Sequence, residues 1–382
     1  LLEDASGMVL RDLAVRDAVT GIRALRSHYV TLDRVRCIGG GAGISVERSD
    51  SATVKNSIVR NTSGRGITFS DSLSGSIRNV TLWSNRSYGV VQEAPVLSRG
   101  DLSVENSLIG TFGSNSFAYL HVRGNWTSDY NCIYVADGAY AGGRIRSGSF
   151  GGQTSRYENV FRWSTVAMLT DYHTLSPTGT LGLADLGSGD FHLKTTAVEG
   201  RYDPAAGSWT NDTINSILMD SGNPASTYTN EPTPNGKAVN IGAYGNTWQA
   251  SKTPTNAGWF SVLTLNDGGT IYGTVTLHWV AGGIATGHHV NVDFSPNAGL
   301  PGTWTNIVVS NAPAARGSID WDTTKFGRSF AGLWRVVSCT DTSIYDISDE
   351  YLTLATNIGG TVWYFVNDSS TNGDVYCTEP GF

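Results

Sequence analysis

The carboxylates Glu47, Asp71 and Glu93, with Arg48 beside the first of them, are the best candidates for acid–base chemistry in this chain. Hydrolysis of a glycosidic bond needs two carboxyl groups roughly 5–10 Å apart. These residues fall near matching corners of successive sequence repeats. No Gly-His-Gly element and no Asp-Asp pair accompany them, and carboxylates do not recur at one position of every repeat. The sequence therefore predicts no catalytic residue.

A second candidate site is a set of oxygen-bearing side chains in a loop-rich stretch: Asp220, Asn223, Glu231 and Asn235. Carboxylate and amide oxygens are ligands that Ca²⁺ prefers. The spacing matches no EF-hand, and Asn and Asp in turns usually bond their own backbone. Calcium is the one cofactor that the sequence suggests, with turn formation as the alternative role.

Sugar binding is the third chemistry that we considered, and its candidates are Arg65, Trp304 and Trp321. Arg65 stands where the other repeats have unrelated residues, so the repeat itself does not require it. Trp304 and Trp321 would bind a sugar ring if exposed and would anchor a core if buried.

A repeat of about 22 residues positions the first half of these side chains. Gly-Ile or Gly-Val pairs stand at 21–22, 43–44, 66–67 and 89–90, and each follows a stretch with apolar ends and a polar third position. The period is too short for most two-helix repeats, and sustained helical spacing is absent. β-Branched residues and Asn, Ser and Gly turns favour short strands. These features predict a parallel β-helix whose coils stack about 4.8 Å apart.

In such a stack, equivalent positions form rows along the axis. One predicted interior row is Val15, Cys37, Val59, Leu82 and Ile109, and a second is Ile22, Ile44, Ile67 and Val90. We expect the polar positions Asn56, Asn79 and Asn106 at a bend between strands, where stacked amides can bond along the axis. The repeated glycines would form another corner, where a positive φ or a close backbone approach excludes a Cβ atom.

These repeats resemble the right-handed parallel β-helix of secreted pectate-lyase-like proteins, clearly over residues 6–122 and more weakly over 123–200. The stretch 216–251 resembles the closing segment of β-helix domains in large exported proteins of environmental bacteria. The matching residues run from Asp220, Gly222 and Pro224 through "EPTPNG" to "NIGAYGNT". Because an open sheet edge invites aggregation, we expect residues of about 200–250 to cover the last coil of a β-helix that spans 1–250.

The rest of the chain has a different pattern. Residues 251–357 contain short alternating strands with regular turn signals, which are typical of a β-sandwich. They resemble immunoglobulin-like or fibronectin-like modules of bacterial surface proteins, with Trp279 as a core anchor. Residues 358–382 resemble the opening of another β-helix module. This resemblance implies one repeat unit of a tandem array.

Composition excludes several classes of partner. The formal net charge is −7, and residues 1–160 carry 17 Lys and Arg against 14 Asp and Glu. The basic residues are interspersed with acidic ones and form no run or known module, so we expect no nucleic-acid partner. No apolar run approaches the length of a membrane span. Four cysteines are too few for a disulfide scaffold, although Cys339 and Cys377 could pair.

The sequence thus predicts an all-β protein, a right-handed parallel β-helix followed by an immunoglobulin-like β-sandwich. We expect a non-catalytic extracellular or cell-surface protein with a structural or adhesive role, which assembles end to end with like modules. The alternatives are a polysaccharide lyase or glycoside hydrolase of the pectate-lyase-like class, and a carbohydrate-binding surface protein without turnover. The first residues lack the basic start and apolar core of a signal peptide, so we expect a piece of a longer protein.

Overall fold

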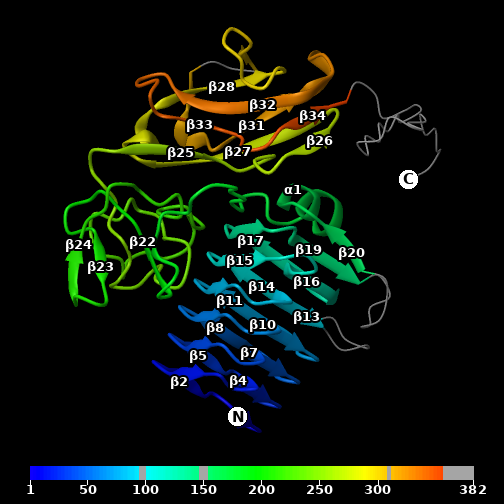
Figure 1. Cartoon of the computed structure of the whole chain (residues 1–382), viewed down its shortest axis with the longest axis vertical. Coiled ribbons are helices and arrows are strands. Elements are labelled where there is room, and N and C mark those ends of the chain that lie inside the picture. Colours follow the sequence, from blue (N-terminus) through cyan, green and yellow to red (C-terminus); the bar gives the residue numbers. More distant parts are fainter. Residues whose placement is uncertain (94–99, 146–153, 308–310, 356–382) are drawn as a thin grey trace, which may run out of the picture.

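The computed structural model describes residues 1–93, 100–145, 154–307 and 311–355. Its first part is a stack of coils, residues 1–145, in which each complete coil contributes one strand to each of three parallel sheets (Figure 1). The predicted tail 358–382, and with it Cys377, lies outside the described residues. We call residues 1–145 the coil stack.

The strands of each sheet follow one another along the stack at a separation of one coil. The first sheet contains β1 (Leu2–Glu3), β4 (Thr20–Leu25), β7 (Ala42–Glu47), β10 (Arg65–Ser70), β13 (Tyr88–Glu93), β16 (Phe117–Arg123) and β19 (Tyr140–Ile145). The second contains β2 (Val9–Arg11), β5 (Thr31–Asp33), β8 (Ala52–Lys55), β11 (Ser74–Arg78), β14 (Asp101–Glu105) and β17 (Asn125–Asp129). The third contains β3 (Ala14–Arg16), β6 (Arg36–Ile38), β9 (Ile58–Arg60), β12 (Thr81–Trp83), β15 (Leu108–Phe112) and β18 (Cys132–Ala136).

The register of these strands sets the interior rows. In the third sheet, Val15, Cys37, Val59, Leu82 and Ile109 stand opposite one another on successive strands. In the first sheet, Ile22, Ile44, Ile67 and Val90 do the same. All but Val15 are almost completely buried in one apolar cluster. Alternation of inward and outward side chains along each short strand explains why these positions are apolar in every coil.

A single residue in the left-handed conformation makes the bend between the second and third sheets of each coil. These residues are Asp12, Arg34, Asn56, Asn79, Asn106 and Tyr130, and their φ angles lie between 48° and 56°. We call them the bend row. Asn and Asp tolerate this conformation better than most residues because their short polar side chains bond locally.

The end of the coil stack far from the N-terminus is closed by residues 154–168. Strand β20 (Thr154–Tyr157) pairs antiparallel with β19, and it is followed by α1 (Val160–Arg162) and the π-helical turn η1 (Trp163–Met168). Trp163 is fully buried and its ring meets those of Tyr119 and Trp126 at the end of the coil core. An aromatic plug thus covers the last coil.

Residues 175–253 form a separate layer on the outer face of the third sheet, which we call the flank segment. It has two small hairpins, β21 (Leu183–Asp185) with β22 (Asp190–Leu193), and β23 (Arg201–Asp203) with β24 (Ser208–Thr210). Leu181, Phe191 and Leu218 share an apolar cluster with the outward-facing Ile58 and Leu108 of the coils. We expected residues of about 200–250 to lie across the last coil; they lie along the side of the stack instead (Figure 1).

The C-terminal domain, residues 258–355, has two sheets around one apolar core. One sheet contains β25 (Gly258–Val262), β27 (Thr274–Gly283) and β31 (Ser318–Asp322). The other contains β26 (Gly269–Ile271), β34 (Leu352–Leu354), β32 (Ser329–Ser338), β28 (His289–Ser295), β29 (Thr305–Asn306), β30 (Ala312–Pro313) and β33 (Tyr345–Ile347). Short 3₁₀ turns occur at η2 (Ile284–Gly287), η3 (Ala314–Arg316) and η4 (Thr323–Lys325). Trp279 is 2% exposed, as expected of a core anchor.

Candidate functional site: a groove along the coil bends

The three bend asparagines bind the flank segment. The Asn56 side-chain amide donates to the carbonyls of Ala243 and Gly245 at 3.2 and 2.7 Å. The Asn79 amide donates to the carbonyl of Asn240 at 3.1 Å. We expected these amides to bond one another along the axis, but they bond across to the flank segment instead.

The third bend asparagine follows the same rule. The Asn106 amide donates to the Ser226 hydroxyl at 2.9 Å, and its side-chain oxygen accepts from the backbone N–H of Asn223 at 2.7 Å. The bend residues therefore supply hydrogen-bonding partners to carbonyl, amide and hydroxyl groups of the flank segment.

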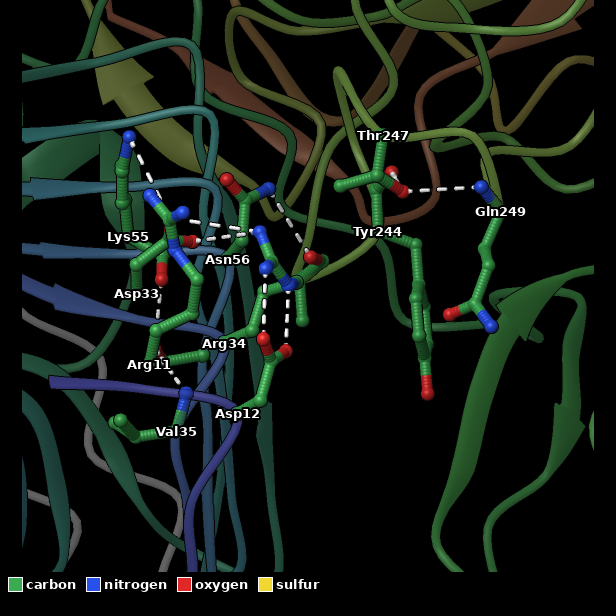
Figure 2. Close-up of polar contacts among 12 residues, drawn as sticks. Arg11, Asp12, Asp33, Arg34, Val35, Lys55, Asn56, Tyr244, Thr247 and Gln249 are labelled. Carbon is green, nitrogen blue, oxygen red and sulfur yellow. Dashed lines mark hydrogen bonds and ion pairs between the residues drawn. The ribbon is translucent and has the colours of Figure 1, made fainter.

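A groove runs beside these contacts, between the coil stack and the flank segment. It encloses about 1250 Å³ between the bend row and the loop 223–248. A continuation of about 410 Å³ runs over the first coils, between Arg34 and Tyr244. Figure 2 shows the Arg34–Asp12 pair on one side of this opening and Tyr244, Thr247 and Gln249 on the other.

Ion pairs organise the coil side of the groove. Arg34 donates from Nε and Nη2 to the two carboxylate oxygens of Asp12 at 2.7 and 2.9 Å. This hydrogen bonding lowers the pKa of Asp12 and raises that of Arg34. The pair is thus held in its doubly charged form in a fixed, planar arrangement.

Asp33 is the buried centre of the same wall, at 3% exposure. It accepts from Arg11 Nε at 3.0 Å, and the Lys55 ammonium lies 3.8 Å from the same oxygen (Figure 2). A buried carboxylate between cations keeps the side chains of neighbouring coils in register. The groove wall is therefore built before any ligand arrives.

The flank side of the groove presents an exposed aromatic ring. Trp248 lines both parts of the groove and is 59% exposed. Tyr202 meets it edge to face, with ring centroids 4.9 Å apart. Thr247 bonds the backbone on either side of Trp248, donating to the Tyr244 carbonyl and accepting from the Gln249 N–H. The sequence reasoning missed Trp248, although a tryptophan in a Gly-Asn-Thr turn is itself a signal, because turns seldom bury a large ring.

The residues that the sequence suggested for sugar binding lie far apart in the fold. Arg65 is on β10 of the coil stack and pairs in register with Tyr88. Trp304 is half-buried in the C-terminal domain, where the Arg335 guanidinium covers its ring at 4.3 Å from the centroid. Trp321 is completely buried, so it is a core residue and no sugar can reach its ring.

Among the residues suggested for calcium, Asp220, Glu231 and Asn235 are neighbours in the flank segment, where the Asn235 amide donates to the Glu231 carbonyl at 3.4 Å. Asn223 donates to the Glu105 carboxylate of the coil stack, whereas Asp220 and Glu231 are buried inside the flank segment. Both oxygens of Asp220 accept from the Thr253 hydroxyl, at 3.1 and 2.8 Å. Within the described residues, no group of three or more His, Cys, Asp or Glu side chains is arranged to hold a metal ion.

Of the acid–base candidates, Glu47 and Glu93 lie on one outward row of the first sheet, whereas Arg48 and Asp71 are left-handed residues that directly follow β7 and β10. Glu47, Ser70 and Glu93 follow one another on β7, β10 and β13. Two bonds from Arg23, at 2.9 and 2.5 Å, lower the pKa of Glu47. Burial raises the pKa of Glu93. The two carboxyl groups therefore lie in environments that shift their pKa values in opposite directions.

The comparison with known families defines the first part of the chain. Residues 1–155 match a family model described as "Right handed beta helix region". These residues, which include the whole coil stack, therefore form a right-handed β-helix, and the prediction of this fold is confirmed. Pectate lyases, glycoside hydrolases and surface proteins all share the family, so the match defines the architecture and does not choose among these activities.

No curated protein matches the chain. Among the described residues, no helix is both long and apolar enough to cross a membrane.

Proposed function

We propose that this chain is a non-catalytic extracellular structural protein with an adhesive surface, a rigid module of a stalk, fibre or sheath. In this proposal the C-terminal domain is an immunoglobulin-like β-sandwich, and the partners of the module are copies of itself or like modules. The observation that carries the proposal is the junction between the coil stack and the C-terminal domain. This junction is buried and hydrogen-bonded on both sides.

Asp267 is central to the junction. Its carboxylate accepts from the backbone N–H of Val160 at 2.7 Å, and its carbonyl accepts from the Asn159 amide at 3.3 Å. Both partners belong to the segment that closes the coil stack. Burial raises the pKa of Asp267 to about 7. A helical turn of one domain is thus tied to a loop of the other.

Asn266 and Asp349 add a second set of bonds. The Asn266 amide donates to the Ser176 carbonyl and to the Asp349 carboxylate, both at 3.1 Å. Asp349 also accepts from the backbone N–H of Thr178 at 2.8 Å. Backbone groups on one domain are therefore satisfied by side chains of the other, which a mobile hinge would not provide.

Apolar contacts complete the junction. Leu263 of the C-terminal domain is buried in the same apolar cluster as Leu175 and Leu181 of the flank segment. The rings of His173 and His278 meet edge to face, with centroids 4.6 Å apart. A stack of hydrogen-bonded coils continued by a fixed second domain is suited to transmitting force and holding a set distance.

Small-angle X-ray scattering combined with activity assays tests this proposal. We expect one rigid particle whose scattering curve follows from the arrangement in Figure 1. Incubation with uronic-acid and neutral polysaccharides should release no reducing ends and no unsaturated products. A flexible pair of domains would contradict the spacer role, and steady turnover would contradict the non-catalytic role.

The opposite pKa shifts of Glu47 and Glu93 favour a second candidate, a glycoside hydrolase. Two coil steps separate them, or about 9.6 Å along the axis, which is near the separation of carboxyl groups in inverting enzymes. Glu93 would then be the acid and Glu47 the base. Turnover in the wild type that is abolished in Glu93→Gln would establish this candidate. Absence of turnover across the panel would exclude it for those substrates.

A further inference from the structure

The charges of the groove are nearly balanced within its own walls. The larger part of the groove is lined by Arg11, Arg34, Lys55 and Arg78 and by Asp12, Asp33 and Glu105. Arg34 is bonded to Asp12, and Arg11 to Asp33. A ligand with many carboxylates would have to displace these internal partners. A ligand with hydroxyl groups can instead add to them, because a hydroxyl both donates and accepts.

The aromatic ring at the rim is oriented in advance. Tyr202, whose ring meets that of Trp248 edge to face, is itself in contact with Trp209 at a centroid distance of 5.8 Å. A ring held in this way loses little conformational freedom on binding. The face of an indole ring carries partial negative charge, and the axial C–H groups of a sugar ring carry partial positive charge. An exposed, oriented tryptophan beside planar polar groups therefore suits a pyranose ring.

The length of the groove suits a chain of sugars rather than one ring. Its lining includes bend residues from Asp12 to Asn106, which are four coil steps apart and span about 19 Å along the axis. The stacked coils repeat the same backbone geometry along this length. A linear polymer with a regular repeat fits such a surface better than a compact small molecule does.

We propose that this groove binds a neutral oligosaccharide, with Trp248 stacked on one sugar ring and the Arg34–Asp12 pair bonding its hydroxyl groups. The Gln249 side chain lies at the same opening and supplies a further amide. The site rests on the adhesive half of the proposed function and is independent of the rigid junction. It would give the module a surface for a neutral glycan without any turnover.

Titration calorimetry with a panel of neutral oligosaccharides, namely gluco-, manno-, galacto- and xylo-oligomers, tests the site. We expect saturable binding of at least one of them by the whole chain, and Trp248→Ala should weaken it by about tenfold or more, since buried aromatic anchors dominate such interfaces. Phe330→Ala is the matched control, because Phe330 is also 59% exposed but lies on the C-terminal domain. Thermal unfolding of each variant separates lost binding from lost folding.

A second variant tests the class of ligand. Asp12→Asn removes the carboxylate that neutralises the charge of Arg34. It should therefore weaken binding of the neutral oligosaccharide. It should also strengthen binding of the corresponding uronic-acid oligomer, whose carboxylates can then pair with Arg34. Absence of binding to every neutral oligosaccharide would overturn the site, and so would a Trp248→Ala variant that binds like the wild type. Preference of the wild type for uronic-acid oligomers would overturn the choice of a neutral ligand. A rigid particle in scattering would uphold the spacer role in each of these cases.

Discussion

At the scale of single residues, the repeated glycines are required by close packing between coils. A Cβ atom built at Gly43 or Gly66 would lie 2.5 Å from the carbonyl oxygen of the corresponding glycine one coil on, and one at Gly89 would lie 2.6 Å from the Ala118 carbonyl. None of these glycines has a positive φ. Of the two explanations that the sequence allowed, close approach is therefore the one that holds, and conformational freedom plays no part.

Replacement of Gly66 by alanine should destabilise the fold by about 1–3 kcal/mol, the usual range for overpacking a core. The added methyl group meets the Gly89 carbonyl, which is backbone and cannot rotate away. Gly179→Ala is the control, because nothing lies within 4 Å of its added Cβ. Urea unfolding measures both variants. Equal midpoints for the two would contradict the packing argument.

Two buried carboxyl groups of the flank segment should make its stability depend on pH. Burial raises the pKa of Asp220 to about 7 and that of Glu231 to about 8. Glu231 Oε1 accepts from the backbone N–H groups of Asn240 and Asn246, at 2.9 and 2.7 Å, whereas Oε2 is buried without a partner. A protonated carboxyl group fits this environment, because the bare oxygen then carries the proton.

The sign follows from the raised values. The unfolded carboxyl groups release their protons near pH 4, while the folded ones keep them until about pH 7–8. The free energy of unfolding should therefore be greatest near pH 4 and below. It should fall as the pH rises from about 4 to about 8 and stay level above that, with a total change of a few kcal/mol. Glu231→Gln, which keeps the Oε1 acceptor, should flatten the decline. Denaturant midpoints from pH 4 to pH 9 would reveal it, and parallel curves for the two proteins would count against it.

At the scale of elements, the sequence could predict the coil stack but not the position of the flank segment. The interior rows were predictable because one short period places apolar residues at the same positions of every coil, as at Val59 and Ile67. The hydrogen-bonding partners of the bend amides could not be predicted, because Asn56 and Gly245 are 189 residues apart and no spacing relates them. Turn-rich loops carry little periodicity, so their place in a fold is set by tertiary contacts alone.

Removal of one bend amide should loosen the flank segment. Asn79→Gly keeps the left-handed bend and deletes the bond to the Asn240 carbonyl. Because the side chain is only 8% exposed, the carbonyl loses a buried partner, at a cost of about 1–3 kcal/mol. Asn61→Gly makes the same change at an exposed left-handed residue and should have little effect. Limited proteolysis within residues 223–249, together with urea unfolding, distinguishes the two; equal protection would argue against the role of the amide.

The candidate groove was not predictable for the same reason. Its two walls, the bend row and the loop around Trp248, are more than a hundred residues apart and meet only in the folded chain. The sequence did identify Trp304 and Trp321 as rings that could bind a sugar if exposed. Strand alternation buries Trp321 on β31, whereas Trp304 lies just before β29 and Trp248 stands in a turn, where no alternation applies.

At the scale of the whole molecule, the junction should make the two domains unfold together. A side chain of one domain satisfies a backbone group of the other at Val160 and at Thr178, so unfolding of either domain leaves buried groups of the other without partners. Calorimetry of the wild type should therefore show one main transition. This expectation is independent of what the groove binds.

Asp267→Ala should uncouple the domains. It removes the acceptor for the Val160 N–H at a partly buried position, which costs about 1–3 kcal/mol at the junction. The C-terminal domain should then melt in a separate, earlier transition, and the scattering curve should broaden. Asp267→Asn keeps one acceptor oxygen and the same shape, so it should stay close to the wild type. A single unshifted transition in both variants would show that apolar contacts around Leu263, rather than the carboxylate, hold the two domains in line.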